Sequence, residues 1–196
     1  MFISTSLTLA ADLDVQEVKL LLPMSSATGS KPLMRYVEDD VTEAVVFDPV
    51  DRAVYDQDVA DALAALDEDQ REKQAKLAKA IERASKGFGQ AVLTVKPGQR
   101  ELRFFYTVTA MPTDTSGQYE VQILAPLASF ILQPGGSIGV TALLPRGTAL
   151  AEAVALQNPD DPGSVLPDMQ QAELGGRTCV GWLWQYDPMF RLRYSY

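Results

Sequence analysis

The sequence predicts a mainly β fold of the α+β type: an antiparallel β-sandwich or open barrel that carries a long helical insertion. Three observations predict it. Apolar and polar residues alternate over short segments in both flanks, turn-forming clusters of Gly, Pro, Asp and Ser separate those segments, and the middle of the chain switches to helical spacing. At 196 residues the chain has the length of a single domain, spanning 1–196, which can bury a core without disulfides or a metal.

The alternation of apolar and polar residues locates the strands. Two strands are expected near the start, around 3–9 and 18–22. The segments 102–110 and 119–123 alternate cleanly on either side of a turn cluster rich in Thr, Ser and Asp, so they are expected to form a hairpin. A Pro-Gly-Gly turn leads into a further strand at 138–144.

Helical spacing marks the insertion, which covers about residues 56–87 and has Gly87 as a natural stop. Asp67 and Gln70 have the spacing of a capping box, so the insertion is either one long helix or two shorter ones. A second, short helix is expected in the C-terminal half, at about 148–156, where Ala and Leu dominate.

Five apolar residues form a stripe along the insertion. The simplest interpretation is that this stripe packs on the sheet, because an amphipathic helix must bury its apolar face. The alternative is a projecting arm that pairs with another subunit, which makes the stripe a candidate interface. Its residues are Val59, Leu63, Leu66, Leu77 and Ile81.

The C-terminal tail alternates aromatic and polar residues, which is typical of one long strand or of two strands divided near Pro188. The aromatic face belongs either to the core or to an exposed ledge that stacks on a glycan or docks a partner chain. The ledge interpretation makes Trp182, Trp184 and Tyr186 candidate residues for binding a glycan or a small ligand.

Four further tail residues are candidates for a protein interface. Arg191 and Arg193 lie on the opposite face of the predicted strand, where they could pair with an acidic partner. Tyr194 and Tyr196 close the tail, and an aromatic strand without a polar extension leaves an adhesive edge unless another strand covers it.

Composition excludes several functions. The chain contains no histidine, which excludes Ser-His-Asp and Cys-His nucleophilic sites and imidazole general bases. Its formal net charge of −9 argues against nucleic acid as a partner, because binding phosphates requires clustered Lys and Arg. The lone Cys179 stands in an apolar run and is expected to be a buried thiol. No cofactor is expected.

Acidic residues leave one enzymatic alternative open. Glu38, Asp39 and Asp40 form a carboxylate run that could hold a divalent metal or supply an acid pair. The simpler interpretation is a solvated charged surface, because unpaired charges are seldom buried.

These observations favour a non-enzymatic structural or interaction protein, a subunit of a homo-oligomer or of a larger assembly such as a particle or virion. The partners expected are other proteins or further copies of the chain. No segment approaches the roughly 20 apolar residues of a membrane span, and no basic region precedes the apolar N-terminal stretch as in a signal peptide. We therefore expect a soluble protein, cytoplasmic or part of an assembled particle.

Overall fold

The computed structural model describes residues 1–12, 17–24, 34–38, 41–85, 87–123, 135–156, 165–166, 169–185 and 188–196. Within these ranges the chain forms two helices and three sheets whose strands all pair antiparallel. The predicted mainly β, α+β fold with a helical insertion is therefore confirmed. Neither described helix is long and apolar enough to cross a membrane.

The largest sheet has seven strands, in the order β13-β14-β10-β1-β7-β3-β4. Its centre is the first strand of the chain, which pairs with β10 on one side and with β7 on the other. Its strands are β1 (Phe2–Thr8), β3 (Met34–Glu38), β4 (Val41–Val45), β7 (Glu101–Thr107), β10 (Ser137–Leu143), β13 (Gln170–Glu173) and β14 (Thr178–Trp184).

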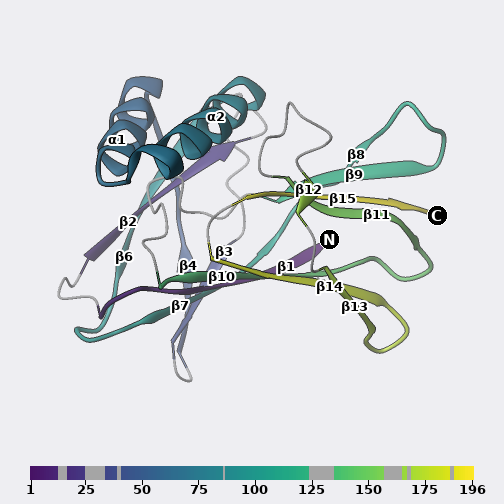
Figure 1. Ribbon diagram of the computed structural model, residues 1–196. Coiled ribbons are helices and arrows are strands. Elements are labelled where there is room, and N and C mark those ends of the chain that lie inside the picture. Colours follow the sequence, from purple (N-terminus) through teal and green to yellow (C-terminus); the bar gives the residue numbers. More distant parts are fainter. Residues whose placement is uncertain are drawn as a thin grey trace.

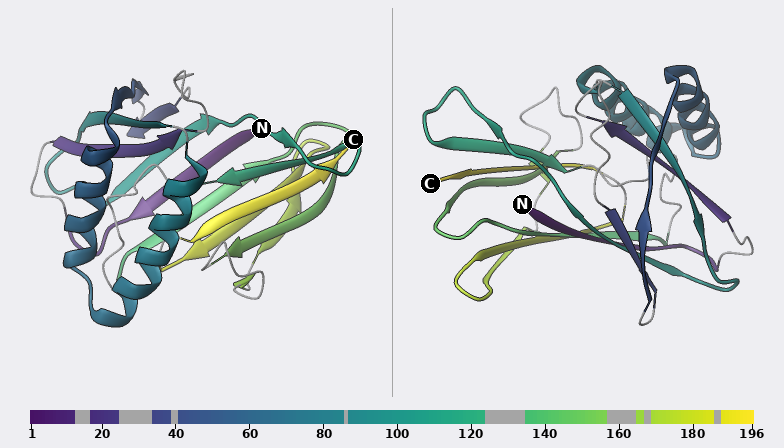
Figure 2. Two further views of the ribbon diagram at one scale, coloured as in Figure 1. Left: turned by 90° about the horizontal axis from the view of Figure 1, so that it is seen from above. Right: turned by 180° about the vertical axis from the view of Figure 1, so that it is seen from behind.

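Two smaller sheets lie side by side over one face of the seven-stranded sheet (Figures 1 and 2). One has the order β12-β11-β15-β9-β8 and the other β2-β6-β5. The five-stranded sheet consists of β8 (Met111–Pro112), β9 (Gln118–Ile123), β11 (Ala149–Leu156), β12 (Val165–Leu166) and β15 (Met189–Ser195). The three-stranded sheet consists of β2 (Glu17–Met24), β5 (Asp48–Val50) and β6 (Gly87–Thr94).

A single large core joins the three sheets, because each contributes its apolar face to the same cluster of buried side chains. In β1 the inward residues Ile3, Thr5 and Leu7 are fully buried, while the residues between them stay half-buried or exposed. The one polar member of this row, Thr5, exchanges a 3.1 Å hydrogen bond with the hydroxyl of Tyr106, which satisfies a group that would otherwise be costly to bury.

The insertion is a hairpin of two helices, α1 (Arg52–Ala64) and α2 (Glu68–Ala84), on the outer side of the three-stranded sheet (Figure 1). The capping-box spacing correctly marked the break, because the Asp67 carboxylate accepts a 2.9 Å hydrogen bond from the Gln70 amide at the start of α2. Arg71 closes the other side of the break by donating to the carbonyls of Leu63 at 3.0 Å and Leu66 at 2.6 Å.

The hairpin is joined to the sheet by a small second core. Tyr55 and Val59 of α1 pack on Leu21 and Phe88, and the rings of Tyr55 and Phe88 stack with centroids 4.1 Å apart. An ion pair of 2.6 Å between Lys19 and Asp58 adds a polar contact between β2 and α1.

The predicted helix at 148–156 is wrong: this segment is strand β11, which pairs with β15 and β12. Alanine favours helices in isolation, yet this segment supplies a whole row of backbone hydrogen bonds to β15, and such tertiary pairing overrides intrinsic propensity.

The predicted hairpin of 102–110 with 119–123 is also wrong. The two segments are strands, but β7 belongs to the seven-stranded sheet and β9 to the five-stranded sheet. Between them the chain crosses from one layer to the other and forms the short β8, which pairs with β9. Alternation shows which face of a strand is buried, but both layers share one core, so the pattern is the same for either partner.

Of the two alternatives left open for the tail, the structure has the second: two strands, β14 and β15, on either side of the division near Pro188. β14 lies in the seven-stranded sheet and β15 in the five-stranded sheet. The predicted aromatic face turns inward in both, and the rings of Trp182 and Phe190 meet between the layers with centroids 5.2 Å apart.

Candidate interaction surface at the open end of the sheets

Three tyrosines form a cluster at the C-terminal end of β15, and the C-terminus lies at one end of the molecule (Figure 1). Tyr194 of β15 stands directly opposite Tyr119 of β9, and their rings stack with centroids 5.7 Å apart. Tyr196 meets both rings edge-on, at 5.8 Å from Tyr119 and 6.1 Å from Tyr194. We call these three residues the tyrosine cluster.

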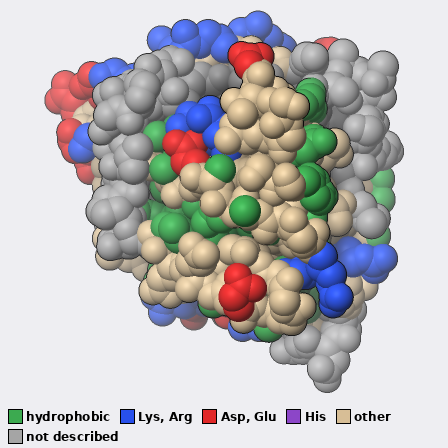
Figure 3. Space-filling view, turned by 90° about the vertical axis from the view of Figure 1, so that its right-hand side faces the viewer, with side chains coloured by type: hydrophobic (Ala, Val, Ile, Leu, Met, Phe, Trp, Pro, Cys, Tyr) green, Lys and Arg blue, Asp and Glu red, His purple; other side chains and the backbone are tan. Residues whose placement is uncertain are grey.

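The tyrosine cluster runs from the core to the surface. Tyr194 is buried, Tyr119 is half-buried and Tyr196 is 72% exposed. Burial is the main cause that raises the pKa of Tyr194 above its ordinary value, and the neighbouring Tyr196 and Tyr119 add to the effect. Hydrophobic side chains gather across the middle of this end face (Figure 3).

The backbone holds Tyr196 in place although its ring is exposed. Its amide donates to the carbonyl of Gly117 at 3.3 Å, in the turn between β8 and β9. That turn is fixed in its own right, because the Thr113 amide donates to the Gln118 carbonyl and the Gln118 amide donates to the Thr115 carbonyl, both at 3.0 Å. The exposed ring is therefore presented by an ordered backbone.

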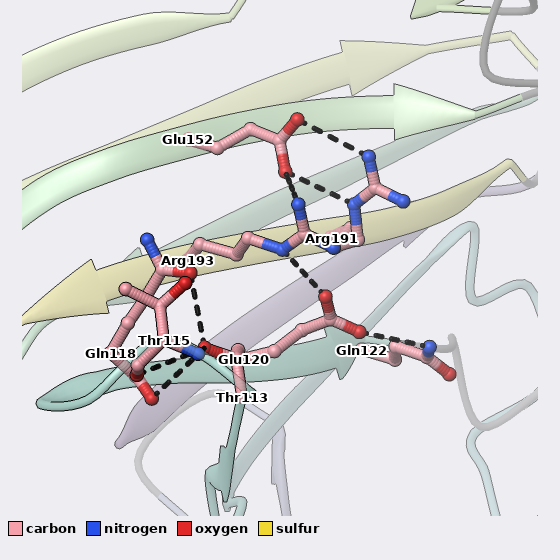
Figure 4. Close-up of polar contacts among 8 residues, drawn as sticks. All are labelled: Thr113, Thr115, Gln118, Glu120, Gln122, Glu152, Arg191 and Arg193. Atoms are coloured by element: carbon pink, nitrogen blue, oxygen red, sulfur yellow. Dashed lines mark hydrogen bonds and ion pairs between the residues drawn. The ribbon is translucent and has the colours of Figure 1, made fainter.

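An ion-pair ladder crosses the outer face of the same sheet, next to the tyrosine cluster in sequence (Figure 4). The Arg193 guanidinium pairs with Glu120 of β9 at 2.7 Å and with Glu152 of β11 at 3.3 Å. Arg191 donates two hydrogen bonds to the same Glu152, each of 3.2 Å. The hydrogen bond to Glu120 is the main cause that raises the pKa of Arg193.

The ladder changes the role expected for the two arginines. Arg191 and Arg193 lie on the outer face, as the alternation predicted, but carboxylates of their own sheet already pair with them. Sequence reasoning missed Tyr119, Glu120 and Glu152. The apolar–polar alternation of each strand shows which face these residues lie on. Only the register between neighbouring strands shows which residues meet across it.

The tryptophans proposed for ligand stacking lie mainly inside the fold. Trp182 is 4% exposed and packs in the core, and Trp184 is half-buried at the end of β14. Tyr186, the third member of this proposed site, lies outside the described residues. Cys179 is half-buried on the outer face of the seven-stranded sheet, so the expectation of a buried thiol is corrected. Cys179 is adjacent to the buried Val180 in β14, and successive residues of a strand point to opposite faces of the sheet.

The described part of the helical stripe packs within its own chain. Val59 is buried in the second core, Leu63 packs beside it, and Leu66 is buried at the turn between the helices. The side chains of Leu77 and Ile81 lie outside the described residues.

The carboxylate run is described only at Glu38, since Asp39 and Asp40 lie outside the described residues. Glu38 is paired with Lys96 at 3.3 Å and accepts a hydrogen bond from the Tyr36 hydroxyl at 3.3 Å. Across the described ranges no group of three or more His, Cys, Asp or Glu side chains is arranged to hold a metal ion.

The fold and these surfaces define a mainly β domain with an ordered, tyrosine-rich end and largely self-paired charges on the adjacent sheet face. Searches with the chain find no matching family model, no matching curated protein and no matching solved structure.

Proposed function

We propose that the protein is a non-enzymatic structural or interaction protein, a subunit of a homo-oligomer or of a larger assembly such as a particle or virion. The observation that carries this proposal is the tyrosine cluster, which presents Tyr196 to solvent at one end of the sheets. Tyrosine is enriched at protein interfaces because its ring buries a large apolar area while its hydroxyl keeps a hydrogen-bonding group.

The order of the cluster supports the same proposal. Binding costs free energy for every side chain that must be immobilised, about 0.5–1.5 kcal/mol for a rotamer-rich one. Tyr196 already has a bonded backbone amide and two aromatic neighbours. Binding of a partner to this ordered tyrosine would therefore cost less free energy for ordering than binding to a tyrosine on a flexible segment.

The two alternative functions have less support from the described residues. Stacking of a sugar on Trp182 would require displacing Phe190, whose ring packs against it. A metal site at Glu38 would have to compete with Lys96 for the carboxylate. The described residues of these two candidate sites include no exposed, preformed group comparable to Tyr196.

Light scattering coupled to size exclusion tests the proposal on the full chain over a wide concentration range. We expect a mass above that of the monomer, and we expect Tyr196→Ser to lower the association constant by at least fivefold. Val92→Ser is the matched control, because it removes an exposed apolar side chain from the three-stranded sheet at the other half of the molecule. A strictly monomeric wild-type chain at every concentration would overturn the proposal.

A further inference from the structure

Among the described residues the three sheets have six edge strands, and five of them have features that hinder pairing with another strand. Proline removes a backbone donor and charges oppose close approach, so both protect sheet edges. The short β8 ends in Pro112, β5 is centred on Pro49, β2 contains Pro23, and the described part of β12 has two residues. β4 carries Glu43 at its midpoint, where pairing with its own copy would place two carboxylates opposite each other.

The sixth edge strand, β13, is short and carries one charged residue, Glu173, but that charge lies at its end and not at its midpoint. Its sequence is Gln-Gln-Ala-Glu, it contains no proline, and all four residues are exposed. On its other side β13 pairs with β14 in regular register, from Gln170 opposite Gly181 to Glu173 opposite Thr178. We infer that β13 is a self-pairing edge: it joins antiparallel to β13 of a second copy, with the two-fold axis at Ala172. This inference rests on the proposed self-assembly and names the partner and the contact.

The hairpin turn shows which backbone groups point to the free side. Leu174 and Arg177 exchange both backbone hydrogen bonds, at 2.9 and 3.2 Å, around two glycines with positive φ. Hydrogen-bonded and non-bonded pairs alternate along an antiparallel ladder, so Ala172 and Gln170 direct their amides and carbonyls toward β14. The amides and carbonyls of Gln171 and Glu173 therefore point away from β14, toward the free edge.

The same alternation selects the register. Opposed residues in the new pair must both point their backbone groups toward the partner or both point them away. An axis at Ala172 satisfies this rule and places Gln171 opposite Glu173 of the second copy, where a carboxamide can donate to a carboxylate. It adds about four backbone hydrogen bonds.

The two neighbouring axes fit less well. An axis at Glu173 places two carboxylates opposite each other, and an axis at Gln171 places Met169 opposite Glu173. Only the axis at Ala172 avoids both a like-charge contact and an apolar side chain facing a carboxylate.

Pairing at Ala172 also joins two half-exposed apolar rows. On the outer face of the seven-stranded sheet, the ladders place Ala172 opposite Cys179, Cys179 opposite Leu143 and Leu143 opposite Phe2. The row continues with a stacked pair, because the Phe2 ring lies 5.7 Å from that of Phe105. In the dimer the row runs without a break from one copy to the next.

A symmetric disulfide tests this register. The variant Ala172→Cys is made in a Cys179→Ser background, because Cys179 lies opposite Ala172 within the same chain and would compete for the new thiol. The axis brings the two introduced thiols face to face in a non-hydrogen-bonded pair, where the side chains are closest. After mild oxidation we expect a disulfide-linked dimer on a non-reducing gel, at a yield at least tenfold above that of the control.

The control is Gln170→Cys in the same background. Its thiol lies on the same face of the sheet as that of Ala172→Cys, but the proposed pairing leaves the two introduced thiols of the dimer four residues apart along the strands. A second variant, Gln171→Pro, removes an amide that points to the free edge and leaves the ladder to β14 intact. We expect Gln171→Pro to abolish the cross-link of Ala172→Cys while leaving the thermal midpoint within about 2 °C of its parent.

The outcomes separate the contact from the assembly. If the wild-type chain assembles in light scattering but Ala172→Cys cross-links no better than Gln170→Cys, the β13 contact is overturned and the proposed assembly stands. If the chain is monomeric throughout and no variant cross-links, both are overturned. Selective cross-linking at Ala172 that Gln171→Pro removes supports both.

Discussion

The guanidinium of Arg193 and the carboxylate of Glu120 meet across two strands at 2.7 Å, and both side chains are only partly exposed. The pair fixes β15 beside β9 from the outer face, while Tyr194 and Tyr119 do so from the inner face. β15, which carries Tyr194, therefore contacts β9 on both faces of the sheet. We expect that removing Arg193 lowers the stability of the fold.

Arg193→Leu is expected to lower the free energy of unfolding by about 1–3 kcal/mol, because it leaves Glu120 and Glu152 half-buried without this cation. Denaturant titration measures the loss. Arg103→Leu is the control: Arg103 pairs with Glu101 of its own strand on a more exposed surface, where such ion pairs contribute little to stability. Equal losses in the two variants would show that the ladder has no special role.

Arg71→Ala is expected to loosen the helical hairpin, because the side chain donates to the carbonyls of Leu63, at the end of α1, and of Leu66, in the turn that follows it. We expect a loss of about 1 kcal/mol, the typical value of a net hydrogen bond, together with faster amide exchange over α1. Hydrogen exchange followed by mass spectrometry measures it. Lys76→Ala removes only a contact within α2, to Glu72, and is the control; unchanged exchange in α1 of Arg71→Ala would contradict the capping role.

The stability of the protein is expected to fall between pH 10 and pH 12, in part through Tyr36. Burial raises the pKa of Tyr36 from 10.0 to about 12. In that range the folded chain keeps a proton that the unfolded chain releases, so rising pH favours unfolding. In Tyr36→Phe this contribution is absent, and the denaturation midpoint should fall less steeply above pH 10. Parallel curves for the two proteins from pH 9 to pH 12 would refute the assignment.

Trp182 should tolerate loss of its indole nitrogen better than loss of its ring. Its Nε1 is buried without a hydrogen-bond partner among the described residues, so Trp182→Phe removes a donor that contributes nothing while keeping much of the packing. We expect Trp182→Ala to cost about 3–5 kcal/mol and Trp182→Phe less than half of that. Thermal and denaturant unfolding compare the two; similar losses would mean that the nitrogen has a partner.

Much of the fold could be predicted from local patterns. The strands near 3–9, 18–22 and 138–144, the helical insertion and its break at Asp67 all correspond to elements of the structure. Each depends on side-chain periodicity or on a cap within a few residues. The error at 148–156 came from the same local reasoning, where the pairing of β11 with β15 outweighed the helix propensity of alanine.

The candidate surface was less accessible to sequence reasoning. Tyr194 and Tyr196 stand out in the tail, but Tyr119 lies 75 residues earlier and joins them only through the register of β9 with β15. Glu120 and Glu152 meet the two arginines for the same reason. Charge alone suggested an acidic partner outside the chain, and the structure supplies the acidic residues from within it.

The sequence by itself determined the apolar–polar alternation of most strands, the place where the helical insertion could break, and the absence of imidazole chemistry, since the chain contains no histidine. Only the tertiary structure decided that 102–110 and 119–123 lie in different layers, that the arginines are paired, and that β13 ends a sheet. The physical reason is that burial and capping depend on neighbours along the chain. Strand order, register and free edges depend on contacts between distant segments.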